Sequence, residues 1–417
     1  MSYRPRIVDA QINKLLHIMG FVLIEGPKAV GKSETARQIA KSVIKLDLEP
    51  AAQELARVSP GLLLAGEVPV LIDEWQIVPE LWSWVKFEVD TRQLPGQFIL
   101  TGSAVPADEI TRDTAAGRLA RLKMRPMSLF ETGHSAGTVS LATLFSGAIP
   151  NAPDSGLSLQ LLVERICAGG WPAFQKLNVN DASFAMSTYL DEIAGIDLQR
   201  VSGVKFNKLN VLRVLKSLAR NVGTKASYST ISADIRTEGN VVNRQVIAEY
   251  LEALQRLMII EDNPPWAPHL RSRDRLNVAS TRYFIDPSLA VVALGASPTT
   301  LLGGEIKYLG FLFENLALRD LRVYMQPIMG RVFQYRDDSG LEVDVILETP
   351  DNQWAAIEIK LSFDQVENAA ANLLRFKSKI DTDICGEPAF MAVLTSTGAN
   401  YVRKDGIYVI SIGSLAP

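Results

Sequence analysis

A glycine-rich segment between an expected strand and an expected helix carries the strongest chemical signal in this sequence. It spans Gly26 to Ser33 and fits the pattern G-x-x-x-x-G-K-[ST] at every fixed position, directly after the apolar run Phe21 to Ile24. Glycines let the backbone wrap a polyphosphate with its amide groups, and the following helix adds a partial positive charge. We expect Lys32 to reach the outer phosphates and the Ser33 hydroxyl to bind Mg²⁺.

Two acidic residues, Asp73 and Glu74, follow a second apolar run, Val68 to Ile72. Carboxylates at the C-terminal end of a strand lie in the crevice where an open α/β sheet binds its ligand. We expect Asp73 to hold the Mg²⁺, directly or through a water, and Glu74 to orient and deprotonate the attacking water. Taken alone, two acids after a strand are more often a solvated turn. The phosphate-binding motif upstream favours the catalytic interpretation.

Two further positions are candidates for the same site. A strand expected at Gln97 to Leu100 ends in Thr101-Gly102-Ser103, where the Ser103 hydroxyl could position water against the terminal phosphate; a plain Gly-Ser turn is the alternative. Arg118 is the first candidate for an arginine that stabilises charge on the transferring phosphate, and Arg121 is the second. A surface salt bridge is the alternative for Arg118.

The elements that must position these residues alternate between helix and strand. The expected order is a helix at Arg6 to Leu16, a strand at Phe21 to Glu25, a helix from Lys32, a strand at Ile44 to Leu48, a helix at Ala51 to Val58 and a strand at Val68 to Ile72. This alternation predicts a parallel sheet with helices on both faces.

Several short segments together resemble one known family. They are Gly26 to Ser33, Leu71 to Gln76, Leu100 to Ser103, Gly117-Arg118 with Arg125 to Glu131, and Gly169-Gly170-Trp171-Pro172. In order and spacing they are similar to the AAA-type ATPases of bacteria and archaea that are fused to a C-terminal domain of unknown function. Lys28 stands where the family commonly has arginine, and Ser33 where threonine is commoner.

The resemblance implies ATP as the ligand, Mg²⁺ as its metal ion and ATP hydrolysis as the reaction. The residues expected to contact the nucleotide are Gly26, Pro27, Lys28, Ala29, Val30, Gly31, Lys32, Ser33 and Glu34. Trp171 is expected to be a packing residue. An arginine supplied by a second subunit would require a homo-oligomer, and the sequence leaves open whether Arg118 acts within its own subunit.

Composition sets the broad limits. A chain of 417 residues suggests two to four domains, and a net charge of -3 indicates no general attraction to nucleic acid or membranes. Cys167 and Cys385 are far apart and lack metal-ligand spacing, which favours a reducing compartment. The N-terminal residues lack the apolar segment of a signal peptide, and no apolar run approaches a membrane span. We expect a cytoplasmic protein without a membrane segment.

The middle third is locally basic. Residues 205–285 contain 13 Lys and Arg against 7 Asp and Glu. Expected helices at Leu209 to Ala219, Tyr228 to Ile235 and Asn243 to Met258, followed by strands at Ile259 to Glu261 and Arg282 to Ile285, indicate a winged helix. Ser229 is the expected cap of the second helix.

A winged helix that binds double-stranded DNA would place its third helix in a groove. Its groove residues would be Asn243, Arg244 and Gln245, and its wing would offer Arg271, Arg273 and Arg275 to phosphates. The acidic Glu249 and Glu252 weaken this interpretation, and contact with a protein partner or simple domain spacing is the alternative.

The C-terminal third combines a helix with two strands that carry charged residues. The helix at Leu309 to Arg322 carries Glu314, a strand at Gly340 to Leu347 carries Asp344, and a strand at Ala355 to Lys360 carries Glu358 and Lys360 on one face. This set resembles the core of restriction-type nucleases with the PD-(D/E)xK motif. The resemblance implies one or two divalent ions, Mg²⁺ or Mn²⁺, held by the acids. Solvated strand charges and a scaffold without cleavage are the alternatives.

The expected fold class is α/β: a P-loop NTPase parallel sheet with a helical lid, a winged-helix domain and a restriction-nuclease-like α/β domain. The expected boundaries are 1–132 for the ATPase core, 133–204 for the lid and linker, 205–300 for the winged helix and 301–417 for the nuclease-like domain. The expected function is ATP hydrolysis coupled to a DNA-binding, nuclease-like module. The alternative is a nucleotide-dependent regulator of DNA or of a protein partner, with an inactive nuclease-like domain.

Overall fold

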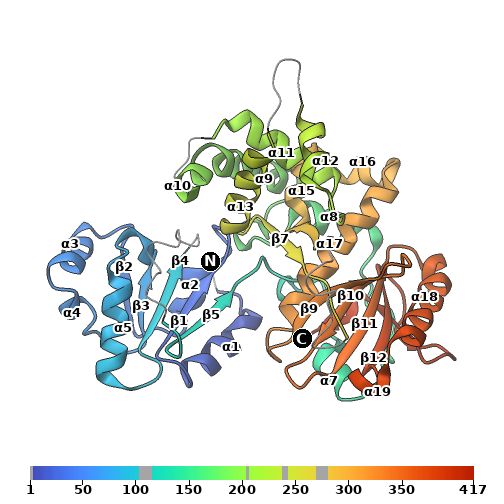
Figure 1. Ribbon diagram of the computed structural model, residues 1–417, viewed down its shortest axis with the longest axis horizontal. Coiled ribbons are helices and arrows are strands. Elements are labelled where there is room, and N and C mark those ends of the chain that lie inside the picture. Colours follow the sequence, from blue (N-terminus) through green and yellow to red (C-terminus); the bar gives the residue numbers. More distant parts are fainter. Residues whose placement is uncertain (1–2, 103–114, 203–205, 237–242, 269–279) are drawn as a thin grey trace. The chain divides into compact units, whose positions relative to one another are not determined.

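The computed structural model describes residues 3–102, 115–202, 206–236, 243–268 and 280–417 (Figure 1). The chain forms two compact units. Unit 1 consists of Met1–Arg125, Ile196–Lys205 and Leu251–Ile259, and unit 2 consists of Pro126–Gly195, Phe206–Tyr250 and Ile260–Pro417.

Unit 1 is built on a five-stranded parallel sheet with the strand order β2-β3-β4-β1-β5. The strands are β1 (Phe21–Glu25), β2 (Ser42–Lys45), β3 (Val70–Asp73), β4 (Phe98–Gly102) and β5 (Leu119–Lys123). The predicted parallel sheet is therefore confirmed. The strand expected at Ile44 to Leu48 is wrong by two to three residues, because the chain turns at Lys45, whose carbonyl accepts the N–H of Glu49 at 3.0 Å.

Helices cover both faces of this sheet (Figure 1). They are α1 (Ile7–Leu16), α2 (Lys32–Arg37), α3 (Pro50–Val58), α4 (Pro60–Leu63) and α5 (Leu81–Arg92). The alternation of buried side chains along β1 explains the two layers. Phe21 and Leu23 pack with α3 and α5, whereas Val22 and Ile24 pack with α1 and α2.

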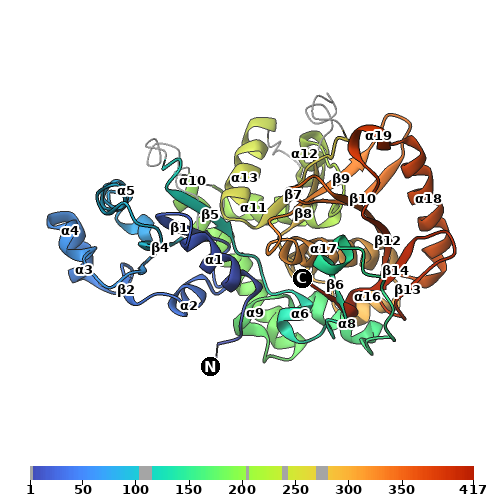
Figure 2. The same ribbon diagram turned by 90° about the horizontal axis from the view of Figure 1, so that it is seen from below.

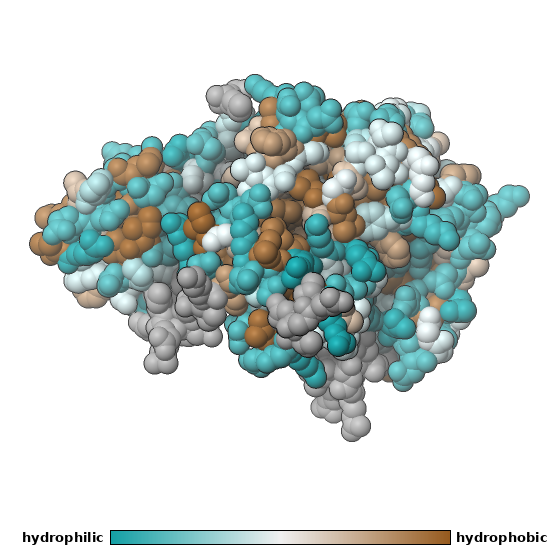
Figure 3. Space-filling view, turned by 90° about the horizontal axis from the view of Figure 1, so that it is seen from above, coloured by the Kyte–Doolittle hydropathy of each residue, from teal (hydrophilic) through white to brown (hydrophobic). Residues whose placement is uncertain are grey.

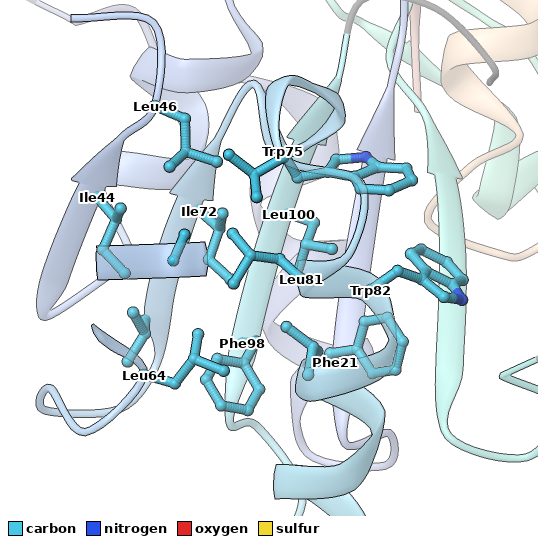
Figure 4. Close-up of a cluster of buried hydrophobic side chains, with 14 of the residues drawn as sticks. Phe21, Ile44, Leu46, Leu64, Ile72, Trp75, Leu81, Trp82, Phe98 and Leu100 are labelled. Atoms are coloured by element: carbon cyan, nitrogen blue, oxygen red, sulfur yellow. The ribbon is translucent and has the colours of Figure 1, made fainter. Parts of the chain in front are cut away.

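The layer on the α5 side packs the aromatic side chains of Phe21, Trp75, Trp82 and Phe98 together (Figure 4). Trp75 and Trp82 lie 5.0 Å apart between ring centroids, and Trp82 contacts Phe21 edge to face at 5.6 Å. Trp75 directly follows the acidic pair Asp73-Glu74, so its burial fixes the chain where the acids leave the sheet.

Unit 2 contains a helical part and a small hairpin. Its helices include α8 (Leu159–Ala168), α9 (Val179–Glu192), α11 (Lys208–Arg220), α12 (Tyr228–Ile235), the first half of α13 (Arg244–Arg256), α15 (Pro287–Leu294) and α16 (Pro298–Gly303). The strands β7 (Ile260–Asn263) and β8 (Thr281–Phe284) pair antiparallel. The helices α11, α12 and α13 and the strands β7 and β8 lie close to the segments where the sequence predicts three helices and two strands, and the winged-helix assignment itself stays a prediction. The wing residues Arg271, Arg273 and Arg275 lie outside the described residues.

Two cap residues in this part differ from expectation. Ser227, not Ser229, caps α12, because its hydroxyl accepts the N–H of Thr230 at 3.1 Å. Asn243 lies before α13, and its side-chain oxygen accepts the N–H groups of Gln245 and Val246 at 2.6 and 3.2 Å. The Asn243 amide oxygen is therefore engaged in capping the helix that it was expected to bring to DNA.

The C-terminal part of unit 2 is a six-stranded mixed sheet with the order β13-β14-β12-β11-β10-β9. The strands are β9 (Arg331–Arg336), β10 (Glu342–Glu348), β11 (Trp354–Lys360), β12 (Phe390–Thr395), β13 (Tyr401–Val402) and β14 (Tyr408–Ser411). β10 and β11 form an antiparallel pair, while β11, β12 and β14 run parallel. The helices α17 (Ile306–Tyr324) and α18 (Val366–Lys379) pack on this sheet.

The segment that begins at Pro126 belongs to unit 2 and pairs with the C-terminal residues of the chain. It contains α6 (Leu129–Thr132), β6 (Val139–Ser140) and α7 (Leu141–Phe145), and β6 pairs with the C-terminal strand β15 (Leu415–Ala416). Figure 2 shows the C-terminus beside β6. The Ser140 hydroxyl donates to the carbonyl of Pro417 at 2.6 Å.

A buried ionic cluster joins α17 to the segments that carried the family resemblance. Arg319 pairs with Asp286 and Asp320 at 2.7 Å each, and all three side chains are at most 2% exposed. Asp320 accepts the N–H of Leu129 at 2.9 Å, and Asp286 accepts the N–H of Gly170 at 3.0 Å. The segments containing Leu129 and Gly170 therefore have a structural role in unit 2.

The Gly-Gly-Trp-Pro element is explained by close packing. A Cβ at Gly170 would lie 2.4 Å from the carbonyl oxygen of Met127, and a Cβ at Gly169 would lie 2.3 Å from the Ser288 hydroxyl. Trp171 is fully buried and contacts Tyr189 edge to face at 5.4 Å. The expectation that Trp171 is a packing residue is confirmed.

Among the described residues, no helix is both long enough and apolar enough to cross a membrane. On the face drawn in Figure 3, hydrophobic residues occur in patches between hydrophilic ones.

Candidate functional site

The glycine-rich segment forms a tight loop between β1 and α2. Ala29 and Gly31 have positive φ angles of 60° and 102°, and Gly31 directly precedes the first helical residue. Gly26 passes so close to the chain after β5 that a Cβ would lie 2.4 Å from the carbonyl oxygen of Met124. Any larger residue at position 26 would therefore displace the loop or the end of β5.

Lys32 lies across the loop. Its Nζ atom donates to the carbonyl oxygens of Gly26 and Pro27, each at 2.9 Å, and the residue is 4% exposed. Burial lowers the pKa of Lys32 to about 8, although the carboxylates of Glu74 and Asp73 oppose this shift. A buried ammonium group whose two described acceptors are neutral carbonyls fits a phosphate as its counter-ion.

Ser33 near the start of α2 contacts Asp73, the last residue of β3, and the sequence predicted that both would lie at one site. The Ser33 hydroxyl donates to Asp73 Oδ1 at 2.7 Å, and the Thr101 hydroxyl at the end of β4 donates to the same oxygen. Asp73 is 5% exposed. Serine and aspartate oxygens suit Mg²⁺, which binds through one or two protein groups together with substrate phosphates. The donor set therefore fits Mg²⁺.

Thr101 belongs to this site, but sequence reasoning gave it no role. It follows Leu100 in the segment whose Ser103 was chosen instead. β3 and β4 pair in register, with Asp73 opposite Thr101, and this register brings the threonine hydroxyl to the aspartate. Ser103 lies outside the described residues.

Glu74 is held at the edge of the site by its own backbone and by a neighbour. Its φ of 54° turns the chain out of β3, and its carboxylate accepts a hydrogen bond from the Gln76 amide. A Cβ at Gly102 would lie 2.9 Å from Gln76 Oε1, so the glycine at the end of β4 leaves space for this amide. Gln76 therefore positions Glu74.

The N-terminal segment braces the phosphate loop, a role that the sequence did not suggest. Arg6 is 6% exposed and donates to the carbonyl oxygens of Val30 at 3.0 Å and Arg125 at 2.7 Å. The Tyr3 hydroxyl lies 3.1 Å from that of Thr35 on α2. These contacts hold the second half of the loop and the start of α2 against the N-terminal segment, so that less conformational entropy remains to be lost on ligand binding.

Arg118 lies at the wrong edge of the sheet to reach a phosphate in its own chain. It precedes β5, whose first residue pairs with Phe21 at the beginning of β1, whereas the loop follows the end of β1. Five strand residues, roughly 16 Å, separate the two edges. The Arg118 guanidinium pairs instead with Asp90 on α5. The second candidate, Arg121, pairs with Glu25 at 2.7 Å.

Comparisons with known proteins agree with the geometry of unit 1. Residues 20–133 match the AAA domain. The match supports an AAA-type ATPase domain in this part of the chain. Residues 159–300 and 309–415 match two models described as domains of unknown function, DUF8612 and DUF4143.

Individual relatives add little about function. Two uncharacterized proteins, one of Mycobacterium bovis and one of Mycobacterium tuberculosis, are each 23% identical to this chain over 352 residues, covering 84% of this chain and 72% of the relative. Among solved structures, a Walker-type ATPase of Pyrococcus abyssi is similar with a TM-score of 0.40 and 17% identity, covering 70% of this chain and 96% of its own.

A second cluster of charged residues lies in unit 2, on β10, β11 and α17. Lys360 Nζ lies 2.9 Å from Asp344 Oδ2 and 2.6 Å from Glu358 Oε2. Asn372 on α18 donates to the other oxygen of Glu358 at 2.7 Å. The structure thus brings together Asp344, Glu358 and Lys360, as the alternation of side chains along the strands predicted.

The fourth predicted residue, Glu314, lies beside this cluster and is bonded to a residue that the sequence did not suggest. The Tyr283 hydroxyl, on β8 of the hairpin, donates to Glu314 Oε1. Burial, and after it the charge of Asp344, raises the pKa of both Glu314 and Glu358 to about 8. Burial alone would lower the pKa of Lys360, but Asp344 and Glu358 together hold it above its ordinary value.

A pocket of about 440 Å³ opens next to these residues. It is lined by Glu342, Asp344, Glu358 and Lys360 and by the amides of Gln365, Asn368 and Asn372. Among the described residues, no group of three or more His, Cys, Asp or Glu side chains is arranged to hold a metal ion. The Lys360 ammonium lies between the two carboxylates instead, so the expected second Mg²⁺ or Mn²⁺ does not fit this arrangement.

Replacing Glu314 with glutamine is expected to reduce the loss of stability at high pH. A carboxyl whose pKa is raised from 4.5 to about 8 on folding stabilises the fold fully below pH 4.5, and this contribution is lost as the pH rises through 8. Glutamine resembles the protonated acid and does not titrate. The melting temperature of the wild type should therefore fall more steeply between pH 4.5 and 8 than that of Glu314→Gln.

The matched control is Glu305→Gln, an exposed residue at the start of the same helix. It should keep the wild-type slope of melting temperature against pH. An equal slope in Glu314→Gln would show that Glu314 is ionised in the fold throughout this range.

Proposed function

We propose that this protein binds Mg²⁺-ATP in unit 1 and hydrolyses it. The observation that carries the proposal is the convergence of Lys32, Ser33, Asp73 and Glu74 at the carboxyl edge of one parallel sheet, around a loop of the phosphate-binding pattern. The match of residues 20–133 to the AAA domain supports it.

Each residue has a distinct role in this proposal. The backbone of residues 26–33 surrounds the phosphates, and Lys32 leaves the carbonyls of Gly26 and Pro27 to neutralise the outer phosphates. Ser33 and Asp73 would hold Mg²⁺, and the bound ion would supply charge neutralisation on the phosphates. Glu74 orients a water and accepts its proton as the water attacks the terminal phosphorus. Thr101 keeps Asp73 in place through its hydrogen bond.

The second part of the proposal concerns unit 2. We infer that nucleotide state is coupled there to a nuclease-like module that binds double-stranded DNA, and that the protein acts in the cytoplasm. The support is the adjacency of Asp344, Glu358 and Lys360 on paired strands beside an open pocket. The alternative is a regulator of DNA or of a protein partner in which the same fold does not cleave. Arg118 cannot reach a phosphate in its own chain. If a second subunit supplied the arginine that stabilises the phosphate charge, the protein would have to form a homo-oligomer.

One assay tests both parts. ATP turnover is measured with Mg²⁺ in the absence and presence of plasmid, linear duplex and single-stranded DNA, and the integrity of the plasmid is followed in the same samples, with Mn²⁺ in a parallel series. We expect turnover without DNA and a further increase with duplex DNA. Turnover that is indifferent to every nucleic acid would favour the protein-partner regulator. Stimulation by DNA with intact plasmid would leave a binding module without cleavage.

The same samples test nucleotide binding itself. Mg²⁺-ATP should raise the melting temperature, because a ligand that binds only the folded state stabilises it. A melting temperature that does not respond to saturating ATP, together with no turnover, would contradict the assignment of unit 1.

A further inference from the structure

Lys28 forms an ion pair that the assignment of the loop does not require. Its Nζ atom lies 2.5 Å from Asp197 Oδ1, although the two residues are 169 positions apart in the chain. Lys28 is the third residue of the phosphate loop, and its side chain is 43% exposed, whereas that of Asp197 is 5% exposed. A nearly buried carboxylate is thus paired with a lysine from the segment that is proposed to surround phosphates.

Asp197 occupies an unusual place in the chain. It is the last residue of a π-helical turn, Ile193–Asp197, which continues into the short helix α10 (Leu198–Ser202). Residues Ile196–Lys205 belong to unit 1, but residues on both sides of them, up to Gly195 and from Phe206, belong to unit 2. π-helical turns cost stability and are frequent at functional sites. The pair therefore joins the phosphate loop to a segment through which the chain passes between the units.

Phosphate and Asp197 are competing partners for the same ammonium group. ATP would bring several negative charges to the loop, and a lysine at its third position is a flexible point charge that can turn toward them. Charge on the phosphates would repel the Asp197 carboxylate as it attracts Lys28. A carboxylate that loses its partner while buried is strongly destabilised, so it must move toward water. Such a movement requires the π-helical turn to change.

We propose that the Lys28–Asp197 ion pair senses phosphate in the loop: ATP draws Lys28 from Asp197 and loosens the segment Ile193–Ser202. This inference rests on the proposed binding of ATP to unit 1. It adds a residue, Asp197, and a direction of regulation that neither the phosphate-binding pattern nor the family matches contain. The ion pair therefore stabilises the conformation that the loop has when no nucleotide is bound.

Thermodynamic linkage relates the Lys28–Asp197 ion pair to the affinity for ATP. If ATP weakens the pair, then the pair weakens ATP binding by the same factor. Asp197→Asn keeps the size and a hydrogen-bond acceptor but removes the competing charge. We expect it to bind ATP about 5-fold or more tightly than the wild type, the lower end of typical coupling between sites.

The experiment combines ATP titration with hydrogen–deuterium exchange of peptides from residues 193–202, using the full chain with ATP and Mg²⁺. In the wild type, ATP should increase exchange in these peptides and decrease exchange in residues 26–33. In Asp197→Asn, exchange in 193–202 should be high without ATP and should not change when ATP is added. Lys28→Met breaks the pair from the other side and should give the same high exchange without ATP.

Asp191→Asn is the matched control, since Asp191 also pairs with a lysine, Lys208 at 3.3 Å, outside the phosphate loop. It should bind ATP as the wild type does. The inference is overturned if the wild type binds ATP with protection of residues 26–33 but unchanged exchange in 193–202, or if Asp197→Asn binds ATP no more tightly. Absence of ATP binding by the wild type would instead overturn the proposed function, and the inference with it.

Discussion

Glu74→Gln is expected to lower ATP turnover by about 100-fold or more while ATP binding is retained, because general-base catalysis typically contributes a factor of that size. Glutamine has the shape of glutamate but cannot accept the proton of the attacking water. The residues expected to bind the phosphates and Mg²⁺, Lys32 and Ser33, are on α2, and their hydrogen bonds go to Gly26, Pro27 and Asp73 rather than to Glu74. Single-turnover hydrolysis with saturating Mg²⁺-ATP would measure the effect.

The binding measurement distinguishes a catalytic role from a structural one. Mg²⁺-ATP should raise the melting temperature of Glu74→Gln as much as that of the wild type. Glu80→Gln, at an exposed glutamate six residues later, should keep both turnover and binding. Wild-type turnover in Glu74→Gln would mean that another group activates the water. Loss of ATP binding would mean that the Glu74 charge maintains the site.

The part of this site that could be predicted from the sequence is the part determined locally. Gly26, Gly31 and Lys32 lie within one strand–loop–helix unit, whose geometry follows from a short pattern. Predicting that Asp73 and Glu74 belong to the site required one additional assumption, that their strand lies in the same parallel sheet. Since ligands bind at the carboxyl edge of such sheets, the acids and the loop were expected to meet, and Ser33 does contact Asp73.

The parts that could not be predicted depend on register or on contacts between distant segments. Thr101 reaches Asp73 because β3 and β4 pair in one particular register. Arg6 and Asp197 contact the loop from far along the chain, and neither has a local pattern to mark it. Arg118 was a candidate because of its residue type, and its position at the start of β5 removes it from the phosphates of its own chain.

The C-terminal cluster shows the same division. The alternation of side chains along β11 placed Glu358 and Lys360 on one face, and antiparallel pairing brought Asp344 beside them. Tyr283 comes from β8, more than twenty residues before α17, and its bond to Glu314 required knowledge of the packing of the hairpin. Residue types alone also suggested a metal site, whereas the lysine is positioned between the acids.

Arg319→Ala is expected to cost unit 2 about 3–5 kcal/mol of stability, the usual result of removing one partner from a buried ion pair. Burial raises the pKa of Asp320, and the charge of Arg319 opposes that shift. Burial would also lower the pKa of Arg319, but Asp320 and Asp286 hold it above its ordinary value. Without the guanidinium, two carboxylates that are 0% exposed would face each other's charge in a medium of low dielectric.

Urea denaturation of the full chain, followed by circular dichroism, would measure the loss of stability in Arg319→Ala. Two further variants test whether this loss comes from buried unpaired charge. Arg336→Ala removes an arginine from an exposed pair with Glu342 and should cost at most about 1 kcal/mol. The triple variant Arg319→Met, Asp286→Asn, Asp320→Asn removes all three charges. The amide oxygen at position 320 can still accept the N–H of Leu129, whereas the single amide oxygen at position 286 replaces two carboxylate oxygens that accept from Gly170 and Ser288. The triple variant should therefore be more stable than Arg319→Ala, because no unpaired charge remains buried. If it is less stable, the ion pairs themselves stabilise unit 2, and the cost of Arg319→Ala reflects their loss rather than the burial of unpaired carboxylates.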